Sequence, residues 1–522
     1  MGEHIMMLYH KYVKKEWKTA FLAALILGFC VHMYKFTNTL PGNDSLYNFY
    51  HSQNIVGAGR WLLTVACGLS SFHDLPWLIG LFSMIYLGLT AVVVADHFRI
   101  KNPVLLVLCA GMITVFPSVT DTLYFEFTAD GYFLAMLLSV LAARLTRMDT
   151  ITPGRMIAAA VLICCACGIY QAYVSTALVL AICGFLQVLL EEQRPAKQYW
   201  KWIGCQAVIY AAALGSYYVI WQVLLKVEQV AAAEYSGISE LGSFGLMTLV
   251  GGVWRMIQTL ILFFFEWNVL ERGFTLYGAA NLILLALLAA GLVSALVKGT
   301  CRRSAQHLLL LGLGLLALPL SICIWHFASP QAAYFPRMLG SVSILFVFTL
   351  VLIERWWKPK WSDLAAAAAV AMILNNAVQA NIAYYYMDRC YERTYADALE
   401  MTMRIRPLAE QSGADRIAIA GNLRTDVSME SSAEVIYFPL LSRTVMGELS
   451  YDHIHVGMFI EELIAPELEF VDQLEAHEIS QSDAVAQMGI WPASDSVAVI
   501  GDTIVIKLDV YDPAEGLSFI PR

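Results

Sequence analysis

The sequence predicts an all-α polytopic membrane protein with about eleven transmembrane helices, followed by a C-terminal α/β soluble domain. Of the 522 residues, 59% are hydrophobic and 14% are charged, whereas soluble domains have roughly 45–50% apolar and about 25% charged residues. Apolar runs of membrane length recur from Thr19 to about Tyr386, and the composition after Tyr386 is ordinary. We therefore expect a membrane domain over residues 1–386 and a soluble domain of normal size over residues 387–522.

Eleven apolar segments approach the roughly 20 residues that a membrane-spanning helix requires. They are Thr19–Phe36, Trp77–Val94, Val104–Phe116, Gly131–Leu145, Met156–Tyr170, Val174–Leu190, Ile203–Leu224, Tyr277–Val297, Leu308–Phe327, Leu339–Ile353 and Asp363–Tyr385. The third, fourth and fifth segments are short, and we expect them to extend into their flanks.

Basic residues mark every second connection between these segments. They are Lys11, Lys14, Lys15 and Lys18 before the first helix, then Arg99 and Lys101, then Arg144, Arg147 and Arg155, then Arg194, Lys197 and Lys201, then Lys298, Arg302 and Arg303, then Arg355, Lys358 and Lys360. The odd connections are richer in acids, namely Asp44, Asp74, Asp121, Glu126 and Asp130. Because short basic loops stay in the cytoplasm, the alternation predicts a cytoplasmic N-terminus and an extracytoplasmic C-terminal domain.

The stretch Phe244–Leu270 is also long and apolar, but we do not count it as a span. If it crossed the membrane, the basic connection that contains Lys298 would move to the outer side. Arg255 and Glu266 within the stretch suit partial burial beside a cavity better than exposure to lipid. The pattern predicts a re-entrant or interfacial element on the outer side.

The chain after Tyr386 predicts a mixed domain. A helix is expected to continue from the last span through residues 387–411. Strand-like runs follow at 416–421, 434–441 and 496–508, and Gly501-Asp502 in the last run predicts a hairpin turn. This part contains no glycine-rich phosphate-binding loop and no metal-binding motif.

The segment between the first two helices is long, polar and aromatic. The turn sequence Pro41-Gly42-Asn43-Asp44 would place Asp44 at the membrane surface. His51 and Arg60 are expected to follow on a short helix. An ordinary solvated loop, with Asp44 as a helix cap, explains the same residues.

The layout of a basic N-terminus, a first helix and an outer loop with Asn43-Asp44-Ser45, aromatic residues and Gly59-Arg60-Trp61-Leu62 resembles the bacterial O-antigen glucosyltransferases of the Gtr type II, serotype-conversion kind. The outer segment SVTDTLYFEFTADGYFLAMLLSVLAARL is also similar to that family. The resemblance implies a GT-C-like architecture with an outer-face active site and a polyprenyl-phosphate sugar, glucose by implication, as donor.

In that family the first outer loop carries an acidic residue that acts as the base or orients the acceptor, and Asp44 matches this position. The sequence departs from the two-acid D-x-D form because Ser45 and Leu46 follow Asp44. The resemblance therefore implies Asp44 as the catalytic residue, with no cofactor; a divalent metal ion is conceivable but not indicated.

Transfer from a lipid phosphate requires a carboxylate to accept the proton of the acceptor hydroxyl, and cations beside the departing phosphate. Arg337, at the outer start of a helix, is the first candidate for binding the donor phosphate, although snorkelling to headgroups explains it nearly as well. Arg60 and Arg255 are the next candidates. The candidate acceptor-binding residues are His51 and, in the second outer loop, Asp121, Glu126 and Asp130. For Asp130, a favourable helix-dipole contact is the simpler explanation.

The expected partners are a polyprenyl-phosphate-linked sugar donor, an envelope glycan acceptor and membrane lipid, with the protein in the bacterial cytoplasmic membrane. A net charge of −9 without a basic stripe argues against nucleic acid. A transporter or flippase of a lipid-linked glycan is the main alternative, although few charges lie mid-span. An assembly protein whose tail binds partners also stays open, as does a membrane acyltransferase with a catalytic histidine, for which His32 and His326 lack a clear partner.

Overall fold

The computed structural model describes residues 13–234, 237, 245–265, 276–298, 304–329, 331–423 and 453–510. The chain divides into two compact units. Among the described residues, the helical unit contains those of 13–38 and 51–381, and the C-terminal unit contains 39–50, 382–423 and 453–510. The division falls inside one helix, and Thr39–Tyr50 belongs to the C-terminal unit although it follows the first helix.

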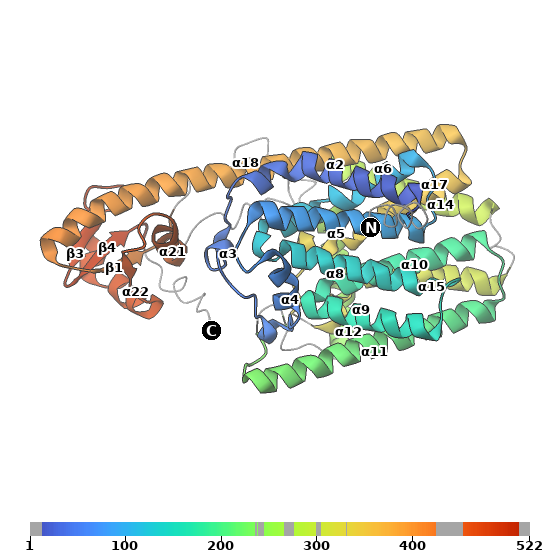
Figure 1. Ribbon diagram of the computed structural model, residues 1–522, viewed down its shortest axis with the longest axis horizontal. Helices are drawn as coiled ribbons and strands as arrows, with labels where there is room; N and C mark the ends of the chain where they lie inside the picture. The colour runs from blue at the N-terminus through green and yellow to red at the C-terminus, as the bar shows by residue number, and fades with distance from the viewer. Residues whose placement is uncertain are drawn as a thin grey trace, which may run out of the picture. The chain divides into compact units, whose positions relative to one another are not determined.

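The helical unit is a bundle of long apolar helices (Figure 1). They are α2 (Lys15–Thr37), α5 (Pro76–His97), α6 (Pro103–Thr114), α7 (Pro117–Tyr124), α8 (Glu126–Leu145), α9 (Pro153–Ile169), α10 (Val174–Glu191), α11 (Ala196–Glu228), α12 (Leu246–Phe265), α14 (Leu276–Lys298), α15 (Ala305–Ile322), α17 (Ser341–Trp356) and the first part of α18 (Pro359–Ser412). Proline at the first position of α5, α6, α7 and α9 suits a helix start, because that position needs no backbone N–H donor.

Eleven helices among the described residues are long and apolar enough to cross a membrane. Ten of them coincide with predicted spans. The eleventh, Thr248–Phe265, lies in the stretch that we did not count, and the predicted span Met156–Tyr170 corresponds to α9, whose 17 residues make it a shorter apolar helix. By length and composition the described residues thus contain eleven candidate spans, as predicted, but α12 takes the place of α9 among them.

The connections that carry the predicted basic residues meet at one end of the helical unit, which we call the basic end. Asp96, at the end of α5, accepts hydrogen bonds from Lys14 at 2.8 Å and from Arg144 at 2.7 Å. Ion pairs join other connections: Arg99 pairs with Asp149 and Glu192, and Arg355 pairs with Glu191. Hydrogen bonds join the rest, from His307 to the Arg194 carbonyl and from Lys298 to the Trp356 carbonyl. The alternation seen in the sequence thus corresponds to one physical end of the bundle.

The contacts of α12 run from α16 toward the middle of the bundle. Arg255 donates a hydrogen bond to the carbonyl of His326, in the short helix α16 (Trp325–Ala328) that follows α15, at 2.8 Å. Near the other end of α12, Phe264 packs on Phe346, in the middle of α17. The predicted re-entrant or interfacial arrangement stays a prediction, because α12 is also long and apolar enough to span a membrane; Glu266 lies outside the described residues.

Close packing of α2 on α5 depends on small residues. A Cβ atom on Gly28 would come within 2.4 Å of the Met84 sulfur, and one on Gly80 would come within 2.4 Å of the Phe36 ring. Small residues let membrane helices approach closely enough for van der Waals packing to hold them together. This packing fixes the last turn of α2, which carries Lys35.

The C-terminal unit contains a four-stranded sheet with strand order β2-β1-β4-β3. The strands are β1 (Arg416–Ala420), β2 (Glu469–Phe470), β3 (Val497–Ile500) and β4 (Thr503–Lys507), and β1 runs parallel to β2 and β4. The helices α21 (His453–Leu463), α22 (Gln473–Ser480), α23 (Asp483–Gln487) and the last part of α18 complete the described part of the unit.

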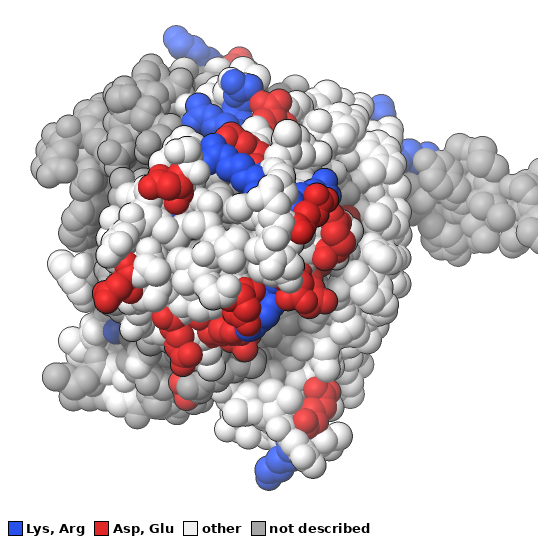
Figure 2. Space-filling view, turned by 90° about the vertical axis from the view of Figure 1, so that its left-hand side faces the viewer, with Lys and Arg blue, Asp and Glu red and all other residues white. Residues whose placement is uncertain are grey.

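Several predictions for this unit are confirmed. The helix over residues 387–411 lies within α18, residues 416–420 form β1, and β3 pairs antiparallel with β4 across Gly501, whose φ is +64°. The predicted strand at 434–441 lies outside the described residues. Acidic and basic side chains are interspersed on the face that Figure 2 presents.

Candidate active site

A buried ion pair joins two helix ends at the end of the bundle opposite the basic end. Lys35 Nζ, in the last turn of α2, donates to Glu126 Oε2 at the first residue of α8. Lys35 is 0% exposed and Glu126 is 3% exposed. A cation at a helix C-terminus and an anion at a helix N-terminus each complement the helix dipole. Even so, Glu126 Oε1 is buried and accepts no hydrogen bond from any residue that the structure describes.

Asp74, immediately before α5, is electrostatically coupled to this ion pair. Its Oδ1 is buried and has no hydrogen-bond partner among the described residues. Burial, and next the negative charge of Glu126, raise the pKa of Asp74 to about 8, against the opposing effect of Lys35. A carboxyl group whose pKa lies near neutrality is poised to exchange a proton, as a general base must.

Asp130 lies one turn after Glu126 on α8, so the two carboxylates share a helix face. Asp130 is 0% exposed, and its Oδ1 accepts a hydrogen bond from the Gly131 N–H at 2.8 Å, whereas its buried Oδ2 accepts none from any described residue. The prediction that Glu126 and Asp130 line an outer loop is wrong. Helix α8 begins five residues before the predicted Gly131, because Glu126 starts it in a favourable first-turn position and carries both acids into the bundle.

Asp121 also departs from its predicted place in a loop. It lies in α7, is 0% exposed, and pairs with Arg337 in the short helix η6 (Pro336–Leu339), which leads into α17. Asp121 Oδ2 accepts from the Arg337 backbone N–H at 2.8 Å and lies 3.5 Å from Nη1. The Arg337 guanidinium stacks 4.2 Å from the ring centroids of Phe125 and Phe335. The structure thus joins one residue predicted to bind acceptor with one predicted to bind donor.

Arg60 is held by aromatic side chains. Its Nη1 donates to the Tyr132 hydroxyl at 3.0 Å, and its guanidinium lies 5.1 Å from the centroid of the Tyr170 ring, which stacks on Tyr132 at 4.2 Å. The expected short helix through His51 and Arg60 is wrong. Residues 51–54 are not helical, and a single bridge between Ile55 and Arg60 closes the loop around the 3-10 helix η1 (Val56–Ala58).

The other three predicted site residues occupy different surroundings. His51 is exposed, with its backbone N–H donating to the Phe72 carbonyl at 3.0 Å. Arg255, which lies on α12, donates a hydrogen bond to the carbonyl of His326. Asp44 is exposed on the four-residue helix α3 (Asn43–Leu46) of the C-terminal unit, and its backbone carbonyl accepts from Asn48 Nδ2 at 2.6 Å. Leu46 of the same short helix belongs to the hydrophobic core of that unit.

Sequence reasoning did not single out Asp74 as a site residue. It is one of several acids in odd connections, and no motif surrounds it. Its position in the sequence could have indicated a site, because Asp74 lies two residues before Pro76, the first residue of a span. An acid at that place in a loop comes close to the ends of neighbouring helices. Only the fold shows that those ends carry Lys35 and Glu126.

Among the described residues, no group of three or more His, Cys, Asp or Glu side chains is arranged to hold a metal ion. The buried acids at this end, with a lysine and backbone donors beside them, have the groups needed for proton transfer and hydrogen bonding. The expectation that no metal is needed stays a prediction.

A family model described as Glucosyl transferase GtrII matches residues 33–353. The matched range covers more than half of the chain and includes Lys35, Asp74, Glu126 and Arg337. No curated protein and no solved structure matches the chain. The family match confirms the resemblance seen in the first outer loop, and the chain belongs to the GtrII glucosyl transferase family.

Proposed function

We propose that this glycosyltransferase moves glucose from a polyprenyl-phosphate donor to a cell-envelope glycan on the outer face of the bacterial cytoplasmic membrane. The observation that carries the proposal is the buried ion pair of Lys35 and Glu126, with the partly buried Asp74 beside it, at the end of the bundle opposite the basic end. The positive-inside rule assigns the basic end to the cytoplasm. The buried ion pair and the C-terminal domain then face outward, where envelope glycans are.

In the proposed reaction, an acceptor hydroxyl attacks the anomeric carbon of the donor. A carboxylate takes the hydroxyl proton as the new C–O bond forms, and the bond to the phosphate oxygen breaks. The electron pair leaves with the polyprenyl phosphate, whose developing charge requires a cation. Each atom transferred is accounted for without a redox partner or a metal ion.

Two carboxylates are candidates for the base. Asp44 matches the acidic position of related enzymes, and it is exposed in the C-terminal unit. For Asp74, burial and Glu126 raise the pKa toward the pH at which a base works best. The chemistry therefore favours Asp74, and Asp44 is the second candidate, with orientation of the acceptor as its other role.

For the donor phosphate we propose Arg337 and Arg60, with Arg255 as third. Arg337 and Arg60 both have their guanidinium groups stacked on aromatic rings, which holds a cation near the bundle end. A phosphate at Arg337 would compete with Asp121. Glu126, Asp130, Asp121 and His51 are the proposed groups for acceptor hydroxyls.

The test is a transfer assay on the purified full-length chain with radiolabelled polyprenyl-phosphate glucose and a panel of envelope glycans. The wild type is compared with Asp74→Asn, Asp44→Asn and, as a matched control at the basic end, Asp149→Asn. We expect transfer by the wild type and the control. Absence of transfer to every glycan, together with movement of the intact donor across vesicle membranes, would replace the proposal by the flippase alternative.

A further inference from the structure

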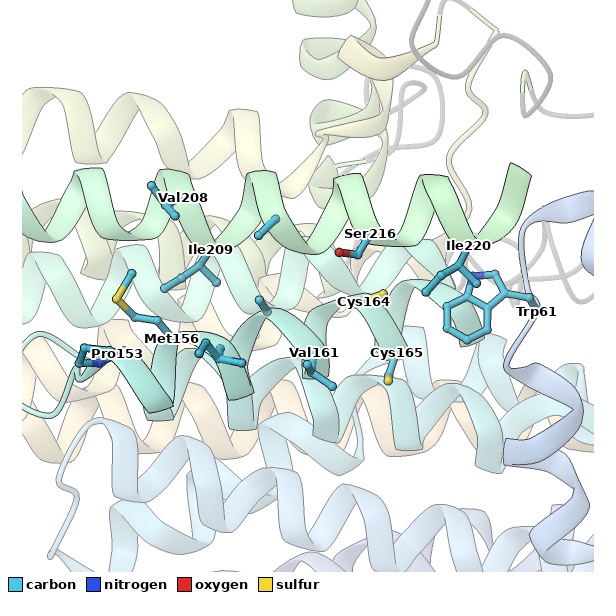
Figure 3. A pocket seen from close by; sticks show the side chains of 13 residues that line it. Trp61, Pro153, Met156, Val161, Cys164, Cys165, Val208, Ile209, Ser216 and Ile220 are labelled. Atoms are coloured by element: carbon cyan, nitrogen blue, oxygen red, sulfur yellow. The ribbon is translucent and has the colours of Figure 1, made fainter. Parts of the chain in front are cut away.

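An apolar groove runs along the outside of the helical unit between α9 and α11 (Figure 3). Its volume is about 610 Å³, and thirteen residues line it. Almost all of them are apolar, and several, such as Ile157 and Val208, are well exposed. The small side chains of Ala160 and Ala212, one from each helix, leave room between larger neighbours. A chain of hydrocarbon fits such a surface, whereas along the groove a sugar would find only the Ser216 hydroxyl and two thiols before the Trp61 indole at its end.

The groove is elongated along both helices. On α9 its lining extends from Pro153 to Cys165, and on α11 from Val208 to Ile220. Twelve helical steps correspond to about 18 Å, which is enough for several isoprene units. The groove starts near the basic end, where α9 begins, and leads to Trp61 in the first loop of the helical unit (Figure 3).

The Trp61 end of the groove is the polar end. The indole Nε1 of Trp61 is buried, and no described residue accepts its hydrogen. A Cβ atom on Gly168 would lie 2.6 Å from the Trp61 ring, so the ring is packed directly against the backbone of α9. An unsatisfied N–H donor in apolar surroundings is costly unless a ligand supplies an acceptor. A phosphate oxygen is such an acceptor.

Arg60 precedes Trp61 and adds charge complementarity. Its guanidinium is held between the Tyr132 hydroxyl and the Tyr170 ring. The loop that carries Arg60 and Trp61 is tied to the neighbouring helices, because Gln171 Nε2 donates to the Ala58 carbonyl at 2.6 Å and to the Tyr217 hydroxyl at 2.9 Å. The groove therefore ends at a rigid loop with a cation and an indole donor.

We propose that this groove binds the isoprenoid chain of the lipid-linked donor, with the donor phosphate at Trp61 and Arg60. The inference rests on the proposed function for the identity of the donor. An elongated apolar groove that ends at Trp61, the residue next to Arg60, matches one prenyl chain on a phosphate. In this proposal, α9 and α11 select donors by the length of the isoprenoid chain, a role that the family match does not specify.

The first test compares two polyprenyl-phosphate glucose donors, one long-chain and one with only two isoprene units. In Ala212→Trp, the indole fills the groove, and the preference for the long donor, measured as the ratio of kcat/KM values, falls by about tenfold or more because apolar contacts are lost. Ala211→Trp places the same side chain on the next residue of α11, which is exposed but does not line the groove. This control keeps the wild-type ratio. Equal ratios in both variants overturn the proposal.

A second test needs no transfer activity, so its failure is separate from failure of the proposed function. The wild-type full chain is photolabelled with a diazirine-bearing long-chain polyprenyl phosphate that carries no sugar. We expect label on peptides of α9 and α11, with competition by unlabelled polyprenyl phosphate and little competition by phosphatidylglycerol. Label spread over other helices, or equal competition by the phospholipid, shows a general lipid-facing surface and contradicts the proposal.

Discussion

The two ends of the helical unit both gather charged residues, but they do so in different ways. At the basic end, Lys14, Arg99 and Arg355 have side chains that are 56%, 49% and 63% exposed, and each pairs with a carboxylate. At the opposite end, Lys35 and Glu126 have side chains that are 1% and 4% exposed. Exposed ion pairs are worth about 0–1 kcal/mol and cost little desolvation, whereas a buried pair must offset a large desolvation penalty.

The acids outside the spans show the same contrast. Burial alone would raise the pKa of Asp149 at the basic end, but the charges of Arg147 and Arg99 more than offset it and lower that pKa below its ordinary value. Burial and the charge of Glu126 instead raise the pKa of Asp74. Asp149 is thus compensated by neighbouring cations, whereas Asp74 and Glu126 each keep a carboxylate oxygen that accepts no hydrogen bond from any described residue. Ionisable groups kept in such an unfavourable state mark a functional site.

The largest expected difference between the ends concerns stability. Replacing Lys35 by Met leaves Glu126 buried without its cation, which costs about 3–5 kcal/mol, whereas Lys14→Met costs about 1 kcal/mol or less. The measurement is the thermal midpoint of the detergent-solubilised protein. The double variant with Lys35→Met and Glu126→Gln regains most of the lost stability. Equal shifts for Lys35→Met and Lys14→Met would remove the distinction between the two ends.

The next effect is on catalysis. Asp74→Asn keeps the shape of the side chain but removes the proton acceptor, so transfer falls by about 100-fold or more. The thermal midpoint stays the same or rises slightly, because an unfavourably buried acid has been neutralised. Asp149→Asn, at the basic end, leaves the transfer rate within a few-fold of the wild type. If Asp44→Asn abolishes transfer and Asp74→Asn does not, the base is Asp44.

A pH profile sharpens the comparison further. The base acts in its ionised form, so kcat/KM rises with pH and levels off above the pKa of Asp74, at about 8. Removing the negative charge of Glu126 in Glu126→Gln favours ionisation of Asp74 and moves the midpoint to lower pH. A profile that is flat from pH 6 to 9 in the wild type would exclude Asp74 as the titrating group.

The smallest effect is expected at the basic end. Arg99→Ala removes an exposed pair with Asp149 and changes the unfolding free energy by about 1 kcal/mol or less. Transfer by the purified variant is unchanged. A loss of transfer as large as that of Asp74→Asn would show that the basic end takes part in the reaction.

Most of the helical architecture follows from the sequence, because apolar length and basic connections are local signals. Ten spans lie where they were predicted, and the hairpin at Gly501 follows from alternation around a turn. The short helix α9 and the long helix α12 exchanged places among the candidate spans, because length alone does not tell a crossing from a returning helix.

The candidate site was less predictable. Arg337 lies at a helix start as expected, but its partner Asp121 is 216 positions away in the chain. Glu126 and Asp130 were predicted to line a loop, but both lie in α8, and the cation that pairs with Glu126 is Lys35, 91 positions earlier in the chain. Asp44 lies on a short helix of the C-terminal unit, and Leu46 of the same helix packs in the core of that unit. No local sequence pattern indicates this packing.

The comparison of the two ends requires that they face opposite sides of the membrane. Cysteine labelling with a membrane-impermeant maleimide in intact cells tests this most directly, with His73→Cys beside Asp74 and Lys101→Cys at the basic end, both at exposed positions. We predict that the His73→Cys variant is labelled in intact cells and that the Lys101→Cys variant is labelled only after the cells are permeabilised. The reverse pattern would place the buried acids in the cytoplasm and contradict transfer on the outer face.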